Sequence, residues 1–231
     1  MNLLVKSSRF YKKIIFLKIY CFFSFRKNSG YLVKLRSPKS VGNKLKEVTK
    51  MIKKLQTPLT EEAVRSLKAG DEVEITGTIY AARDMAHKRM CNALKIGEKL
   101  PFELKGAVIY FVGPTPARPG RVIGAAGPTT SGRMDAFSPI LIAAGLKVMI
   151  GKGYRNQAVR DACKKYGAVH LSVVGGAGAL LSKYIMSNKI IGYEDLTTEA
   201  IREFVVKDLP AIVAYDSRGG SVYEENIKNK R

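Results

Sequence analysis

The stretch from residue 146 to residue 178 reads LKVMIGKGYRNQAVRDACKKYGAVHLSVVGGAG. Its first apolar run (146–150) predicts a buried strand, which a glycine-rich turn follows. Asn156 can cap a helix that Gly167 ends, and a second apolar run (169–174) predicts the next strand. A strand, a helix and a strand in this order are typical of an α/β domain with a largely parallel sheet.

The same alternation continues on both sides of this stretch. Further strands are predicted over 71–80, 106–113, 122–126 and 210–216, and further helices over 60–67, 84–94, 137–144 and 179–186. Residues 44–55 form a basic amphipathic stretch before them. The turns that follow the strands lie at the carboxyl ends of the sheet, where ligands usually bind in α/β folds. The polar side chains of these turns are therefore the candidates for function.

The positive charge of the chain is concentrated in its N-terminal quarter. The formal net charge is +21, from 40 Lys and Arg and 19 Asp and Glu. Residues 1–55 hold 15 of the basic residues and one acid, Glu47, so this part carries +14 and residues 56–231 carry +7. A nucleic-acid-binding domain is expected to keep its basic excess within the folded part. The distribution fits an enzyme for anionic substrates better than a basic binding module for nucleic acid or acidic partners.

Residues 1–45 contain no acid and are left out of the predicted fold. Three interpretations stay open: a transit peptide, a signal or membrane segment, and a start codon placed too early. Lys18 interrupts the apolar stretch 14–25, whose pieces are far shorter than the roughly 20 residues that span a bilayer. We expect an N-terminal extension (1–45), a folded domain (46–231) and no membrane partner. The expected location is the cytoplasm, or an organellar matrix if the extension is a transit peptide.

The three cysteines, Cys21, Cys91 and Cys163, lie far apart and never in CxxC spacing. An odd number of isolated cysteines argues against a disulfide framework and favours a reducing compartment. Nearby ligand pairs for zinc or an iron–sulfur cluster are missing, and the chain has only two histidines. We therefore expect no metal site made by this chain alone.

The densest group of candidate side chains is the stretch 127–135, GPTTSGRMD. Its small residues let backbone N–H groups approach an anion, and Arg133 can bind a carboxylate through two nitrogens. Thr129, Thr130 and Ser131 add hydroxyl groups. The alternative is a common Gly/Pro/Ser surface turn with a solvated arginine.

Three other turns carry weaker signals. Lys152 lies between two glycines after a buried strand and can face an anion, but the phosphate-loop motif GxxxxGK[ST] is absent. Arg83 can bind a carboxylate while Asp84 caps the following helix, and His87 is expected to be a structural or surface histidine rather than a base. The alternatives are a plain surface lysine and a capping salt bridge. The glycine turn 175–178 lacks the dinucleotide pattern GxGxxG and is expected to be a tight turn lining the site.

Together these stretches resemble one family. Residues 127–135 resemble the signature of the β subunit, or C-terminal domain, of class I iron–sulfur fumarate hydratases and L-tartrate dehydratases. Residues 81–87 (AARDMAH), 110–119 and 151–153 resemble further characteristic stretches of that family in the same order. The likeness covers about residues 56–226, which is essentially the whole predicted domain.

The resemblance implies a swivelling β/β/α domain, so that residues 46–231 would be the β-type catalytic domain of an iron–sulfur hydro-lyase. It implies reversible hydration of the dicarboxylate fumarate to L-malate, with L-tartrate dehydration as the alternative. It also implies an α subunit that holds a four-iron four-sulfur cluster through three cysteines. The chain would then be active only with this partner, in a heterotetramer, without nucleic acid or membrane.

The resemblance also implies roles for individual residues. Thr129 resembles the residue that takes the C–H proton, and Thr130 resembles a hydrogen-bonding neighbour. Arg83, Arg133 and Lys152 resemble the cations that bind the carboxylates of the substrate. Removing a proton beside a carboxylate builds negative charge on it, so cations placed in advance stabilise the transition state more than the ground state. The implied catalytic residues are Thr129, Arg133 and Lys152, and the implied substrate-binding residues are Arg83, Thr130, Arg133 and Lys152.

Overall fold

The computed structural model describes residues 52–224. These residues belong to one unit, Met51–Arg231. The predictions on the extension 1–45 and on its boundary with the domain lie outside the described residues, as does most of the stretch 44–55.

The strands are β1 (Lys53–Gln56), β2 (Glu72–Ala81), β3 (Val108–Tyr110), β4 (Val148–Gly151), β5 (Val169–Ser172), β6 (Ile185–Gly192) and β7 (Ile201–Tyr215). The α-helices are α2 (Glu61–Arg65), α3 (Asp84–Lys95), α4 (Ser138–Ala143), α5 (Gln157–Tyr166) and α6 (Gly178–Leu181). Short 3₁₀ helices are η1 (Ser131–Met134), η2 (Ser182–Tyr184) and η3 (Glu194–Glu199). No helix between residues 52 and 224 is long and apolar enough to span a membrane.

The ends of α5 follow from local sequence. Asn156 accepts the backbone N–H of Val159 through its side chain (3.0 Å), which satisfies a free donor of the first turn. Gly167 ends the helix in the left-handed region with φ of 65°, where a residue without a Cβ atom is unstrained. Both predicted end signals of this helix are confirmed.

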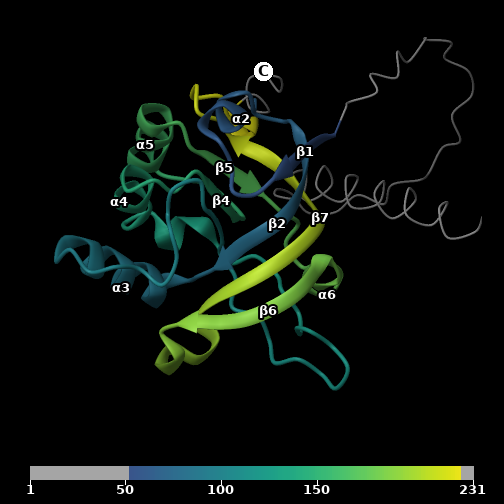
Figure 1. Ribbon diagram of the computed structural model, residues 1–231. Helices are drawn as coiled ribbons and strands as arrows, with labels where there is room; N and C mark the ends of the chain where they lie inside the picture. The colour runs from purple at the N-terminus through teal and green to yellow at the C-terminus, as the bar shows by residue number, and fades with distance from the viewer. Residues whose placement is uncertain (1–51, 225–231) are drawn as a thin grey trace, which may run out of the picture. The chain divides into compact units, whose positions relative to one another are not determined.

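The seven strands form one sheet in the order β1-β2-β3-β4-β5-β7-β6. Neighbouring strands from β1 to β5 are parallel, whereas β7 runs antiparallel to β2, β5 and β6. Because β7 pairs with both β2 and β5, the hydrogen-bonded strands close on themselves, and Figure 1 shows the long curved β7 that makes this closure. The predicted α/β class is confirmed, and the sheet is mixed rather than largely parallel.

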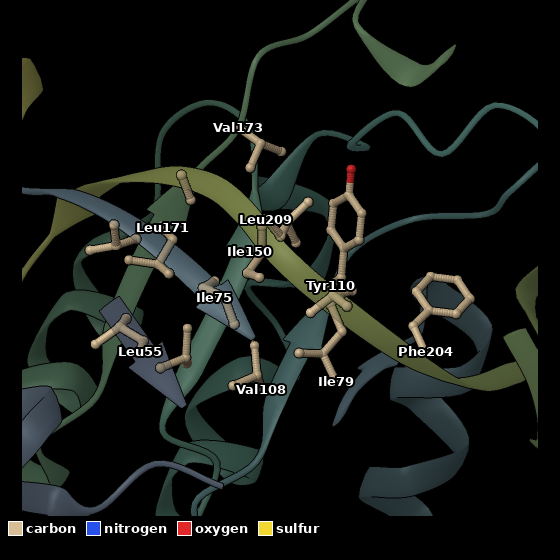
Figure 2. Packing of buried hydrophobic residues seen from close by; sticks show 14 of the residues in the cluster. Leu55, Ile75, Ile79, Val108, Tyr110, Ile150, Leu171, Val173, Phe204 and Leu209 are labelled. Carbon is tan, nitrogen blue, oxygen red and sulfur yellow. The ribbon is translucent and has the colours of Figure 1, made fainter. Parts of the chain in front are cut away.

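Two apolar clusters lie on opposite sides of β3 and β4. Val108, Tyr110 and Ile150 point into the closed sheet, where they pack with residues of β2 and β7 (Figure 2). Ile109 and Met149 belong to the other cluster, together with residues of α3, α4 and α5. Alternate residues of one strand enter different clusters, so these strands are apolar at every position. Helices α3, α4 and α5 thus cover one face of β3 and β4, and β2 and β7 lie on the other side of the inner cluster.

The predicted strand 122–126 is wrong. Gly124 donates its backbone N–H to the carbonyl of Thr115 (3.2 Å), and Ala126 donates to the carbonyl of Gly178 (3.0 Å). The segment therefore bonds back onto its own loop and onto the start of α6, so these N–H groups are satisfied without a strand neighbour.

The sequence predicts only part of the hairpin of β6 and β7. The helix predicted over 179–186 ends at Tyr184, and Ile185 begins β6. β7 begins at Ile201, well before the predicted start, and Pro210 lies within it, opposite Glu74 of β2. Proline rarely occurs inside a paired strand, because it lacks the N–H that the ladder needs. The pattern therefore places the start of the strand at the proline, although the strand continues on both sides of it.

Candidate functional site

The segments that contain the predicted site residues follow the carboxyl ends of neighbouring parallel strands. Arg83 follows β2, Lys152 follows β4, and the turn 175–178 follows β5. The loop 127–135 contacts the segments that follow β3 and β4. Since β2, β3, β4 and β5 are neighbours in the sheet, these segments come together at one edge of the parallel strands.

Backbone hydrogen bonds fix the loop 127–135 against this edge. Thr129 donates its N–H to the carbonyl of Phe111 (2.8 Å), and Ser131 donates to the carbonyl of Lys152 (2.8 Å). Thr130 and Lys152 form an isolated parallel β-bridge. Thr130 and Lys152 are exposed, and Thr129 is half-buried. The fold therefore brings the two threonines and the lysine onto neighbouring backbone segments.

Two glycines allow side chains to lie close to this edge. A Cβ atom on Gly151 would overlap the hydroxyl of Ser131, so the loop packs here only against a residue without a side chain. A Cβ atom on Gly113 would lie 2.9 Å from both Cδ and Nη1 of Arg83. The Arg83 side chain thus lies across the segment that follows β3.

A chain of ion pairs connects Arg133 with Arg83. Nε of Arg133 donates to Oδ1 of Asp84 (2.7 Å), and Nη2 of Arg83 lies 3.7 Å from Oδ2 of Asp84 and 3.4 Å from Oε1 of Glu199. The prediction that Asp84 caps its helix is wrong, because Glu199 accepts the N–H of Met85 instead (2.9 Å). The carboxylate of Asp84 is therefore available to orient the two arginines.

Several donors at this edge have no partner within residues 52–224. The terminal nitrogens of Arg133 donate no hydrogen bond there, and the ammonium of Lys152 makes no ion pair there. The buried Nε of Arg83 lacks a hydrogen-bond partner in the same range. The Lys152 side chain extends toward the glycine turn, since a Cβ atom on Gly175 would lie 3.5 Å from its Cδ. Unpartnered cationic donors on adjoining segments are suited to binding an anion with more than one carboxylate.

Both histidines are buried and neutral near pH 7. Burial lowers the pKa of His87 to about 4, and the charge of Arg155 adds to the shift. Burial also holds the pKa of His170 well below its usual range, again with a contribution from Arg155. Nδ1 of His87 lies 2.8 Å from the carbonyl of Arg83. His87 is therefore structural, as the sequence predicts.

The sequence does not identify two ionic residues that support the site. Glu199 comes from η3, and the fully buried Arg155 forms an ion pair with Asp135 (Nε to Oδ1, 2.6 Å). Asp135 is part of the signature stretch, but 20 residues separate it from Arg155 and no spacing rule connects them. Glu199 is 114 residues from Met85, the residue whose N–H it accepts.

The cysteines in the described part of the chain do not fit an iron–sulfur cluster. Cys91 and Cys163 are buried in α3 and α5. Burial raises the pKa of both thiols, to about 12 for Cys163, whereas a ligand must be a thiolate. Within residues 52–224, no group of three or more His, Cys, Asp or Glu is placed to hold a metal ion.

The family described as the fumarase C-terminus matches residues 32–226. The chain belongs to this family. The match includes every helix and strand named above and begins inside the predicted extension 1–45. The signature stretch 127–135 therefore lies within a fumarase C-terminal domain.

The similar proteins differ in how much of their own length this chain covers. The chain is 36% identical over 161 residues to the anaerobic class I fumarate hydratase of Escherichia coli, covering 69% of this chain and 29% of that protein. It is 35% identical over 160 residues to fumarate hydratase 2 of Leishmania major, covering 68% and 28%. It is 38% identical over 173 residues to a Methanocaldococcus jannaschii protein named as an L(+)-tartrate dehydratase subunit beta, covering 72% and 89%. The chain thus spans under a third of the fumarate hydratases and most of the beta subunit.

Proposed function

We propose that the chain is the β subunit of a hydro-lyase that reversibly hydrates fumarate to L-malate together with an α subunit. The observation that carries this proposal is the grouping of Arg83, Arg133, Lys152 and Thr129 at one edge of the sheet in a fumarase C-terminal domain. The M. jannaschii protein, which matches over 89% of its length, is named as a beta subunit, and this name supports the β-subunit role.

The cations supply the electrostatic part of the proposed reaction. The outer nitrogens of Arg133 bind one carboxylate of the substrate in a bidentate way, and Lys152 and Arg83 bind the dicarboxylate as further cations. When a proton leaves the carbon beside a carboxylate, negative charge spreads onto that carboxylate. Donors already held in place by the fold stabilise this charge without reorganising during the reaction.

Removal of the proton from the reacting carbon is assigned to Thr129. Its backbone is fixed by the bond to Phe111, and its half-buried side chain lies on the segment next to Lys152. A threonine hydroxyl is a poor base unaided, so nearby cations or an acid of the partner subunit must activate it. Thr130, which pairs with Lys152 through the backbone, is assigned to hydrogen bonding with the substrate.

The four-iron four-sulfur cluster is assigned to the α subunit, because Cys91 and Cys163 do not fit as its ligands. The cluster supplies a Lewis acid for the substrate's hydroxyl and carboxylate. The residues of this chain bind the carboxylates and move the proton. A heterotetramer of two chains of each kind is the proposed assembly. We further propose a cytoplasmic location, or an organellar matrix if residues 1–45 are a transit peptide.

L-Tartrate dehydration is the second candidate function. The relative that matches over most of its length is named as an L(+)-tartrate dehydratase subunit beta. L-Tartrate and malate are both dicarboxylates with a hydroxyl group, so the cations of this chain would bind either substrate. The groups that distinguish them are therefore proposed to lie on the α subunit.

Co-expression with candidate α subunits, followed by anaerobic assay of the purified complex on fumarate, L-malate and L-tartrate, tests the function. We expect the complex to hydrate fumarate and each chain alone to be inactive. Iron–sulfur reconstitution of this chain alone is expected to yield no stoichiometric cluster. Turnover of L-tartrate alone would favour the second candidate, and a cluster on the isolated chain would contradict the two-subunit proposal.

A further inference from the structure

The side chain of Arg155 is fully buried and uses all three nitrogens of its guanidinium group. Nε donates to Oδ1 of Asp135 (2.6 Å), and Nη2 donates to Oγ of Ser138 (2.6 Å). Nη1 lies 3.3 Å from Sδ of Met149 and 3.4 Å from Nδ1 of His170. The partners come from four segments: the loop 127–135, α4, β4 and β5. One side chain therefore connects these segments beneath the candidate site.

The contacts of Arg155 lead directly to the loop that carries Thr129 and Arg133. Asp135 is the last residue of that loop, and its second oxygen accepts the backbone N–H of Asn156 (2.7 Å). Both oxygens of this carboxylate are thus engaged by the start of α5. The loop end is fixed in position and in rotation, because two separate bonds hold one planar group.

A second route runs from Arg155 to the middle of the same loop through His170. Nε2 of His170 lies 3.2 Å from Oγ of the buried Ser131. Ser131 in turn donates its N–H to the carbonyl of Lys152 and packs against Gly151. Arg155 is thus connected to the loop on both sides of Arg133, at Ser131 and at Asp135.

We propose that Arg155 is a positioning residue, which sets the placement of Thr129, Arg133 and Lys152 relative to one another. The inference rests on the proposed function. A buried ion pair adds little net stability compared with well-packed apolar side chains, because both charges lose their hydration. The contacts of the three guanidinium nitrogens instead hold the loop 127–135, α4, β4 and β5 in one geometry relative to one another. A misplacement of about 1 Å in an active site can reduce turnover by about 100-fold.

The test compares Arg155→Lys with the matched control Arg160→Lys in the complex with the α subunit. Lysine keeps the charge of Arg155 but cannot reach Asp135 and Ser138 together. Arg160 lies on α5, five residues after Arg155, and forms an ion pair with Glu224 (2.6 Å), outside the loop contacts. Kinetics are measured well below the melting midpoint of each variant. Ser138→Ala, which removes one acceptor, is the second variant in case Arg155→Lys does not fold.

We expect kcat of Arg155→Lys to fall by about 100-fold, and the primary deuterium isotope effect on C–H cleavage to rise. Arg160→Lys should stay within about twofold of the wild type, and Ser138→Ala should lose about tenfold in kcat. A merely structural role would lower the melting midpoint but leave kcat and the isotope effect of the folded variant unchanged. That result, or an equal loss in the Arg160→Lys control, would overturn the inference.

Amide hydrogen exchange on the full chain separates this inference from the proposed function. In Arg155→Lys the amide of Ser131 should exchange about tenfold faster than in the wild type. The amide of Val169, bonded to Lys147 at the other end of β5, serves as the unaffected reference (2.9 Å). An inactive wild-type complex would contradict the proposed function but not the positioning role. Unchanged exchange at Ser131 in Arg155→Lys would overturn the positioning role, whether or not the complex is active.

Discussion

Nε of Arg133 lies 2.7 Å from Oδ1 of Asp84, although the two residues are 49 positions apart in sequence. Asp84 thus holds the arginine through its inner nitrogen and leaves the two outer nitrogens directed away from this bond. Arg133 is half exposed, whereas Asp84 is largely buried. We expect this pair to restrict the orientation of Arg133 before substrate binds, which is the preorganisation that electrostatic catalysis needs.

Asp84→Asn is expected to lower kcat/KM of the complex by about tenfold, since a charged hydrogen bond that orients Arg133 becomes a neutral one. The free energy of unfolding should change by at most about 1 kcal/mol, because the pair is partly exposed. Steady-state kinetics and urea unfolding measure the two effects. Asp195→Asn, which breaks the exposed pair with Arg89, is the control. Wild-type kcat/KM in Asp84→Asn would show that Arg133 does not depend on this carboxylate.

Arg133→Lys is expected to reduce transition-state stabilisation by about 2–4 kcal/mol, the range for losing one preorganised donor. Lysine keeps the charge but loses both the fork for the substrate and the Nε bond to Asp84. The loss should fall on kcat as well as on KM, because charge on the carboxylate grows along the reaction. The exposed Arg118 provides the matched control, Arg118→Lys. Near-normal turnover in Arg133→Lys would show that the loop is an ordinary surface turn with a solvated arginine.

The buried His87 predicts a loss of stability in mild acid. Its pKa is about 4 in the folded chain and about 6.5 in an unfolded one, so between these values the unfolded state binds more protons. The contribution of His87 to the free energy of unfolding is therefore fully present above pH 6.5 and is lost toward pH 4. This loss amounts to about 3 kcal/mol. His170 acts in the same direction.

His87→Asn isolates this contribution. The asparagine amide can replace Nδ1 as the donor to the carbonyl of Arg83 but does not titrate. Urea unfolding at several values between pH 4 and pH 7 should show a pH dependence smaller than that of the wild type by up to one proton. An identical pH dependence in the two proteins would mean that His87 does not titrate in this range.

Local sequence patterns predict the parts of the fold that local forces determine. Strands β3 and β4 are buried on both sides, so their continuous apolar runs identify them. The closure of the sheet by β7 depends on pairing with β2, whose Glu72 lies opposite Ile212. No local pattern encodes a contact over that sequence distance, and Pro210 hides the continuity of the strand.

The same limit applies to the site. The signature stretch contains the proposed site residues Thr129 and Arg133, because small, hydroxyl and cationic residues are concentrated there. The residues that contact the proposed site side chains and their loop come from elsewhere. Asp84 of α3 contacts Arg133, Glu199 of η3 contacts Arg83, and Arg155, in the segment before α5, contacts Asp135. Each of these acts through a contact that only the folded sheet creates, so sequence spacing could not reveal it.

We propose that this chain supplies the proton-transferring side of the active site, through Thr129. The most direct measurement is deuterium exchange from solvent into the reacting carbon of L-malate, catalysed by the complex with wild-type chain or with Thr129→Val. Valine has nearly the same shape but no hydroxyl. We expect the wild-type complex to catalyse exchange and Thr129→Val to lose it by at least about 100-fold, with substrate affinity nearly unchanged. Exchange at the wild-type rate in Thr129→Val would show that the hydroxyl of Thr129 does not move the proton.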